Sequence, residues 1–261
     1  NNQTVKMGLN SPVTLTDTKG TLGNYSITNA NGINASVSGN NLTVSITSEN
    51  YDKTITFGRT KTARDVHIIY GAGSDQKVIY MATRSDPTPN FKLNFDLMYA
   101  DIEVEKQDVE TGNKTQGDAT FNGATFAIKD TNGNTFETLT TNGSKVKSKK
   151  YPVGTTLNVC EVTSPEGYLT NNNCNSVTLG YSGDNTPSTF STTIKDQVIK
   201  GRIEIAKTVD KEKYGLFQSN VQKPGKGFKF DIILKSTGKV VSTLTTDEDG
   251  RAISDYLPYG T

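Results

Sequence analysis

The chain has 261 residues, which is enough for two domains and part of a third. Its 28 Lys and Arg residues nearly balance its 27 Asp and Glu residues, and no basic face with interleaved aromatic side chains is present, so we expect no nucleic-acid partner. One histidine and two cysteines leave little room for a zinc site or a histidine-based triad, and no apolar run approaches the length of a membrane span.

The first hundred residues, 1–100, read as one all-β domain. Short alternating segments are separated by turn residues, as in "PVTLTD", "NASVSGNNLTVSIT", "VHIIY" and "FKLNFDLMY". Seven or so such strands in one domain length predict a β-sandwich. Asp17 continues the apolar face of Val13 and Leu15, and we interpret it as a strand-end aspartate that faces a turn.

The rest of the chain contains a tandem repeat. Four segments return in the same order: "IEVEK" at 102–106 as "IEIAK" at 203–207, "FAI" at 126–128 as "FDI" at 230–232, "TLTT" at 138–141 as "TLTT" at 243–246, and "YPVGT" at 151–155 as "LPYGT" at 257–261. A period near one domain length predicts a second domain over 101–200 and a truncated copy of it over 201–261. We therefore expect tandem sandwich domains joined by short, stiff links, within a longer protein.

Three ionisable residues continue apolar strand faces of the second domain. By the two-residue period of a strand, Lys106 in "IEVEK", Glu161 in "LNVCE" and Asp196 in "FSTTIKD" point the same way as the apolar residues that precede them. Burying this set as ions is costly, because each charge loses several kcal/mol of hydration and one negative charge stays uncompensated.

Two arrangements would relieve this cost. One is a hydrogen-bonded ion pair between Lys106 and Asp196, with Glu161 kept protonated. The other is covalent: the lysine amine attacks the aspartate carboxyl, water leaves, and an amide replaces both charges. An apolar site favours a neutral amine and a protonated Glu161, which can then shuttle the proton and hydrogen-bond the developing oxyanion. Both arrangements remain open at this point.

Several of these segments carry a family resemblance. "IEVEKQDVETG", "GATFAIKDTNGN", "YPVGT", "EVTSPEGYL" and "IKDQVIKG" resemble the collagen-adhesin B-type (SpaA-like) repeat of Gram-positive surface adhesins and pilins. The resemblance covers 101–200 fully and 201–261 in part, and it implies an Ig-like or prealbumin-like Greek-key β-sandwich. It also implies an intramolecular Lys–Asn/Asp isopeptide bond, in which Lys106 matches the nucleophile, Asp196 the acceptor and Glu161 the catalytic acid.

The resemblance extends to further residues. Lys207 matches the nucleophile of the next repeat, and we expect it to be unreacted here because its acid and acceptor partners are missing from this chain.

In an exported protein, Cys160 and Cys174 are expected to pair across neighbouring strands. Two free thiols are the alternative, since many Gram-positive surface proteins avoid cysteine.

The leading functional interpretation is a structural stalk segment of a bacterial cell-surface adhesin or pilin, cell-wall anchored through a region outside this chain. Its neighbours would be other surface-protein domains. The alternative is a ligand-binding adhesin whose first domain grips a host matrix protein. An enzyme acting on external substrates is not expected, because the buried trio is the only cluster of titratable groups that the sequence offers. We expect neither a cofactor nor a metal.

Overall fold

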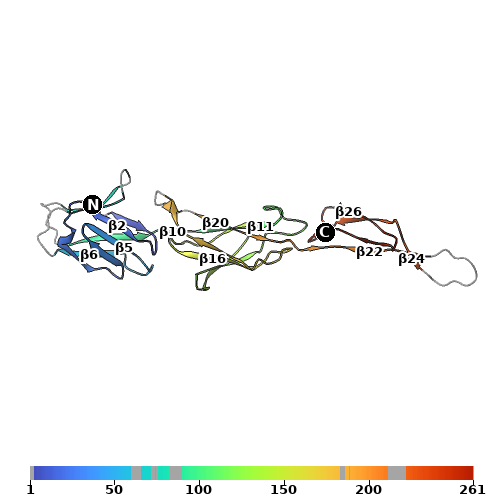
Figure 1. The fold of residues 1–261 in the computed structure, drawn as a ribbon, viewed down its shortest axis with the longest axis horizontal. Coiled ribbons are helices and arrows are strands. Elements are labelled where there is room, and N and C mark those ends of the chain that lie inside the picture. Colours follow the sequence, from blue (N-terminus) through green and yellow to red (C-terminus); the bar gives the residue numbers. More distant parts are fainter. Residues whose placement is uncertain are drawn as a thin grey trace, which may run out of the picture.

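The computed structural model describes residues 3–59, 66–71, 74, 76–82, 90–182, 186–187, 189–210 and 222–260. Its regular structure in this part is almost entirely β-strand, arranged as three groups of strands that follow one another along the long axis of the molecule (Figure 1). The predicted all-β, tandem-sandwich fold class is confirmed. Within the described residues, the search for a helix long and apolar enough to cross a membrane finds none.

The first domain is a sandwich of two sheets. One sheet has the order β1-β9-β6-β3 and the other β4-β5-β2-β7-β8. Their inner faces form one core that includes Leu15, Phe57 and Phe91, because apolar residues alternate with polar ones along strands such as β2, β5 and β9. The elements are β1 (Thr4–Met7), β2 (Val13–Asp17), a 3-10 turn (Leu22–Asn24), β3 (Tyr25–Asn29), β4 (Asn34–Ser38), β5 (Asn41–Ser45), β6 (Thr54–Arg59), β7 (Val66–Tyr70), β8 (Lys77–Ala82) and β9 (Asn90–Leu97).

The second domain is also a two-layered sandwich. A sheet of order β14-β11-β20 faces a sheet of order β13-β12-β16-β17, and a separate core with Val104, Phe126 and Leu157 lies between them. The strands are β10 (Tyr99–Ala100), β11 (Ile102–Asp108), β12 (Thr125–Lys129), β13 (Thr135–Thr140), β14 (Lys145–Lys147), β15 (Tyr151–Pro152), β16 (Thr156–Thr163), β17 (Cys174–Thr178), β18 (Tyr181–Ser182), β19 (Thr186–Pro187) and β20 (Phe190–Asp196).

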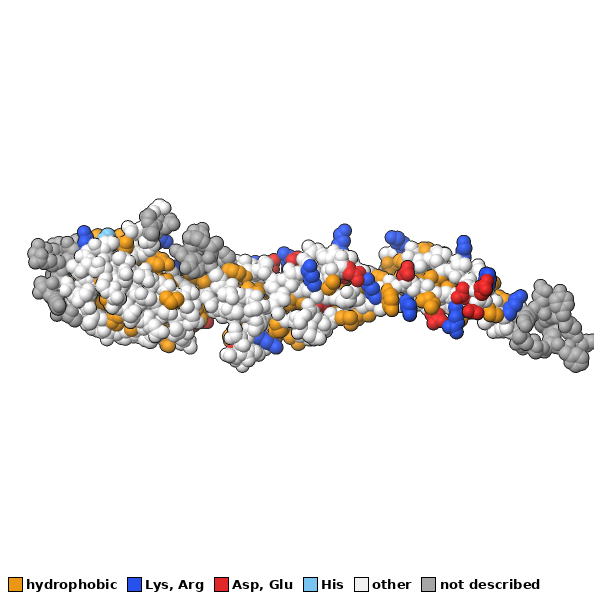
Figure 2. All heavy atoms as spheres, in the orientation of Figure 1, with side chains coloured by type: hydrophobic (Ala, Val, Ile, Leu, Met, Phe, Trp, Pro, Cys, Tyr) orange, Lys and Arg blue, Asp and Glu red, His pale blue; other side chains and the backbone are white. Residues whose placement is uncertain are grey.

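The third domain has a smaller core. Its described strands pair only two by two, as β21-β28, β22-β27, β23-β24 and β25-β26. Apolar side chains such as Phe228, Ile233 and Ile253 stay exposed, and Figure 2 shows apolar and charged side chains interspersed over this domain. The strands are β21 (Lys200–Gly201), β22 (Glu204–Ala206), β23 (Thr208–Asp210), β24 (Gln222–Pro224), β25 (Lys229–Leu234), β26 (Lys239–Thr245), β27 (Arg251–Ile253) and β28 (Leu257–Pro258).

The joint between the first and second domains is a short strand pair. The linker strand β10 pairs with β15 of the second domain, so the link is held by main-chain hydrogen bonds. The next residue, Val153, accepts a hydrogen bond at its carbonyl from the N–H of Leu9 in the first domain, at 2.6 Å. Gly154 follows with φ +94°, and a Cβ at this position would lie 2.0 Å from the Leu9 carbonyl oxygen.

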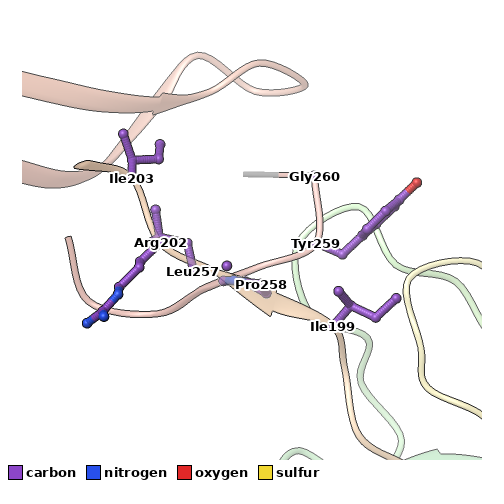
Figure 3. A pocket seen from close by; sticks show the side chains of 8 residues that line it. Ile199, Arg202, Ile203, Leu257, Pro258, Tyr259 and Gly260 are labelled. Carbon is purple, nitrogen blue, oxygen red and sulfur yellow. The ribbon is translucent and has the colours of Figure 1, made fainter. Parts of the chain in front are cut away.

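The joint between the second and third domains repeats this construction. The linker strand β21 pairs with β28, and the carbonyl of Tyr259 accepts a hydrogen bond from the N–H of Asp118 in the second domain, at 2.9 Å. The Tyr259 hydroxyl also donates to Glu166 at 2.7 Å. A hollow of about 260 Å³, open to solvent, lies at this joint and is lined among others by Ile199, Leu257 and Tyr259 (Figure 3). Gly260 again packs against the neighbouring domain.

The repeated segments "YPVGT" and "LPYGT" therefore occupy the same place in both joints. In each, a carbonyl accepts a backbone N–H bond from the preceding domain, and the glycine that follows it lies close to that domain. The sequence comparison finds the repeat, but it does not reveal that the repeated loop is a contact between domains.

We expect Gly154→Ala to bend or loosen the first joint. The new methyl group would overlap the Leu9 carbonyl oxygen. The left-handed backbone at this position would add about 1–2 kcal/mol of conformational strain for alanine. Small-angle X-ray scattering should therefore report a smaller maximum dimension. Gly133→Ala is the matched control, because Gly133 has φ +91° with nothing within 4 Å. Equal scattering from both variants would show that the glycine contact does not determine the angle or stiffness of the joint.

Candidate functional site

The first and last strands of the second domain lie side by side. β11 and β20 pair in parallel, with Lys106 opposite Ile194 and Asp108 opposite Asp196. Alternation along both strands turns Lys106 and Asp196 into the core, where they are 0% and 1% exposed. The parallel register therefore brings the lysine and the aspartate, which are far apart in the sequence, within reach of each other.

Glu161 approaches from the opposite sheet. It lies on β16, opposite Phe126 of β12, and its side chain is fully buried. The Lys106 ammonium is 2.7 Å from Glu161 Oε1 and also contacts Asp196 Oδ1. The structure thus brings all three candidate residues together in one cluster.

The surroundings of this cluster are apolar. The Lys106 ammonium lies 5.9 Å from the centre of the Phe126 ring, and both Phe126 and Ile194 are buried. Such an environment strengthens electrostatic interactions and makes each unpaired charge costly. One ammonium group faces two carboxyl groups here, so the charges do not balance if all three ionise.

The Asp196 carboxyl is the least satisfied member of the cluster. Its Oδ2 atom is buried and meets no hydrogen-bond donor among the described residues. Burial raises the pKa of Asp196 to about 6, even though the nearby Lys106 ammonium opposes that rise. This carboxyl therefore holds a proton more readily than an ordinary aspartate does.

Glu161 is held through its second oxygen. The backbone N–H of Asn171 donates to Glu161 Oε2 at 2.7 Å, which leaves Oε1 for the Lys106 ammonium. The acid is thus oriented by a main-chain group from the loop between β16 and β17. The sequence shows an asparagine-rich stretch here, but it has no strand periodicity that would indicate this contact.

Asp108 is a buried neighbour of the cluster that the sequence interpretation missed. Its carboxylate accepts hydrogen bonds from the N–H groups of Glu110 and Thr111, the Gln116 amide and the Tyr168 hydroxyl. Burial works against ionisation, but these bonds together lower the pKa of Asp108 below its ordinary value. The alternation that indicates Lys106 also indicates Asp108, two residues later on the same face.

The two cysteines lie directly opposite each other on β16 and β17. Cys160 and Cys174 form a disulfide, with their Cα atoms 4.2 Å apart. Because Cys160 immediately precedes Glu161, the disulfide fixes the edge strand β17 to the strand that carries the acid.

Lys207 and Asp17 lie in different surroundings from the trio. Lys207 is half-buried, with its ammonium 5.3 Å from the centre of the Phe228 ring, and it forms no ion pair with any residue in the described part of the chain. The Asp17 carboxylate accepts backbone N–H bonds from Lys19, Thr21 and Leu22. The interpretation of Asp17 as a strand-end residue that faces a turn is confirmed.

Comparison with protein families identifies the second domain. The sequence model of the SpaA family, described as a prealbumin-like fold domain, matches residues 100–197. The resemblance to the collagen-adhesin B-type, SpaA-like repeat is thereby confirmed for this domain. A search of curated proteins finds no match.

Comparison with solved structures gives distant similarities. The Bacillus anthracis TIE protein is 18% identical with a TM-score of 0.50, and the match covers 95% of this chain and 44% of that one. BcpA, the major pilin subunit of Bacillus cereus, is 14% identical with a TM-score of 0.33, covering 75% and 67%. The major pilin SpaD from Corynebacterium diphtheriae is 9% identical with a TM-score of 0.31, covering 73% and 57%. The chain thus spans less than half the length of the TIE protein, with which it shares the fold.

Proposed function

We propose that Lys106 and Asp196 condense into an isopeptide bond that ties the first strand of the second domain to its last. The lysine Nζ forms a bond to Asp196 Cγ, one Cγ–O bond breaks, and the lost oxygen leaves as water with two protons. No oxidant or other reactant is needed. The observation that carries this proposal is the buried contact of Lys106 with both Glu161 and Asp196.

The charge balance of the site supports a covalent bond over a permanent ion pair. A buried ion pair has to offset several kcal/mol of desolvation for each ion, and here a second carboxyl remains beside the pair. Condensation removes the charged ammonium and one carboxyl group. It also removes one buried carboxyl oxygen, since Asp196 Oδ2 has no hydrogen-bond donor among the described residues. The raised pKa of Asp196 favours the protonated carboxyl, from which water can leave.

Glu161 has the role of proton carrier in this reaction. Its Oε1 can take a proton from the Lys106 ammonium at 2.7 Å and deliver it toward the Asp196 carboxyl. In its neutral form it donates a hydrogen bond to the oxyanion that develops on Asp196. Because all three groups are held in contact, the reaction is intramolecular and much of its entropic barrier is already removed.

The function that follows is mechanical. The chain is a stalk segment of a Gram-positive surface adhesin or pilin, with domains divided near residues 100 and 200 and neighbouring surface-protein domains as its partners. Tension that enters the second domain along β11 leaves along β20, and the proposed bond connects these two strands directly. The short paired links at both joints keep the domains in line.

Pulling single molecules from both ends tests this function. We expect the second domain of the parent chain not to extend, whereas Lys106→Met should add an unfolding event. With the Cys160–Cys174 disulfide reduced, the stretch of about 90 residues between the linked positions would lengthen by about 300 Å in that event. Lys145→Met is the control, because Lys145 is an exposed lysine paired with Glu103. An equal extension of the second domain in the parent would contradict the stalk function.

A further inference from the structure

The asparagine-rich segment 171–175 connects the two sheets of the second domain at the site. The backbone N–H of Asn171 donates to Glu161 Oε2 at 2.7 Å, and its side-chain amide donates to the carbonyl of Lys195 at 3.0 Å. One residue therefore contacts both the acid and the residue that precedes the acceptor Asp196.

Asn175, on β17, adds a second connection between the same two sheets. Its side-chain amide donates to Thr192 Oγ1 at 3.0 Å and to the carbonyl of Thr193 at 2.8 Å. β17 and β20 are edge strands of different sheets, so these contacts close one side of the sandwich. Asn173 supports the arrangement, because its N–H donates to the Asn171 side-chain oxygen at 3.0 Å.

The disulfide anchors this segment to the strand that carries the acid. Cys174 lies within the segment, and its partner Cys160 is the residue before Glu161. An edge strand has hydrogen bonds on one side only and frays more easily than a central strand. The disulfide removes that freedom at the point where the segment leaves the sheet.

We propose that Asn171 is the positioning residue for Glu161 and that the Cys160–Cys174 disulfide holds Asn171 in place. This inference rests on the proposed cross-link. The Asn171 N–H occupies Oε2 and leaves Oε1 directed at Lys106, while the Asn171 amide sets the distance between the acid and β20. Small errors in the placement of reacting groups slow such reactions strongly, by about 10²-fold for a shift of 1 Å.

The rate of water loss from freshly made chains tests the proposal. The full chain would be produced by cell-free synthesis in a glutathione redox buffer, stopped at intervals, reduced, and analysed by intact mass. Asn171→Ala keeps the backbone N–H that reaches Glu161 but removes the side-chain bond to Lys195 that holds this N–H in place. We expect this variant and the double variant C160A/C174A each to slow the loss of water by about tenfold or more. Asn171→Gln, which keeps the amide donor, should recover part of the rate, and Asn172→Ala, at an exposed neighbour, should match the parent.

Thermal unfolding in a Lys106→Met background separates positioning from stability, because no cross-link can form there. Positioning predicts a slow reaction although Asn171→Ala leaves the melting temperature of the Lys106→Met background unchanged. A parental rate in Asn171→Ala, or a rate loss that only follows melting, would overturn the proposal and leave the cross-link intact. A parent chain that loses no water would overturn the cross-link, and the role of Asn171 with it.

Discussion

Purified and reduced, the parent chain should be lighter than its sequence by one water, and Lys106→Met should keep its full mass. The substitution removes the nucleophile and retains an unbranched apolar side chain of similar length in the core. Intact-mass spectrometry measures the difference directly. A parent chain at full mass would limit Lys106 and Asp196 to an ion pair.

The same substitution should strongly destabilise the second domain. It removes the cross-link and leaves the Asp196 carboxyl free and buried beside Glu161. By analogy with a disulfide that closes a loop of about 90 residues, the lost cross-link alone costs about 4–5 kcal/mol. For a domain of about 100 residues, each kcal/mol lowers Tm by about 4–8 °C, so the transition should fall by more than about 12 °C. Differential scanning calorimetry would measure the shift.

Lys145→Met provides the comparison for both measurements. Lys145 lies on β14, next to β11, and its ammonium is 2.9 Å from Glu103 in an exposed pair. Such pairs contribute about 0–1 kcal/mol, so this variant should lose water as the parent does and melt within a few degrees of it. A large Tm loss in Lys145→Met would mean that lysine removal in this sheet is destabilising regardless of the cross-link.

Glu161→Gln should block the reaction while the domain still folds. Glutamine has nearly the shape of glutamic acid and can still accept the Asn171 N–H bond, but it cannot carry a proton from Lys106 to Asp196. Loss of a general acid–base group typically slows a reaction by about 10²–10⁴-fold. Freshly synthesised Glu161→Gln should therefore remain at full mass long after the parent has lost its water.

Glu103→Gln is the control for this variant. Glu103 lies on β11 with Lys106 but on the opposite face, and it pairs with Lys145. It should react at the parental rate. If Glu161→Gln also reacts at that rate, Glu161 is only a buried neutral neighbour, and contact between the lysine and the aspartate would be sufficient for the bond.

The sequence predicts the faces of strands better than the contacts between them. Lys106, Glu161 and Asp196 are ionisable residues that continue apolar strand faces by the two-residue period, and the structure buries each of them. Their mutual contact depends on the sheet order β14-β11-β20 and on the packing of the other sheet. The family resemblance supplies that link, since no local pattern encodes which strands become neighbours.

Irregular segments were the hardest part to predict. Tyr168 donates to Asp108 across 60 positions of sequence, and Asn171 reaches two strands from a loop without periodicity. The repeated glycine of the joints, Gly154 or Gly260, is visible as a motif. Its purpose depends on where one domain meets another, and strand alternation carries no information about that contact.

The adjacency of β11 and β20 also bears on how proteases could sever the stalk. With Lys106 joined to Asp196, a nick anywhere between them leaves two fragments still covalently connected. Within the second domain, only a cut outside that interval separates its two ends, and the segments beyond it include the linker strands β10 and β21. Both are paired with a neighbouring strand, whereas a protease needs an unpaired, extended substrate. At the two ends of the second domain, the links to its neighbours are thus shielded by their own hydrogen bonds.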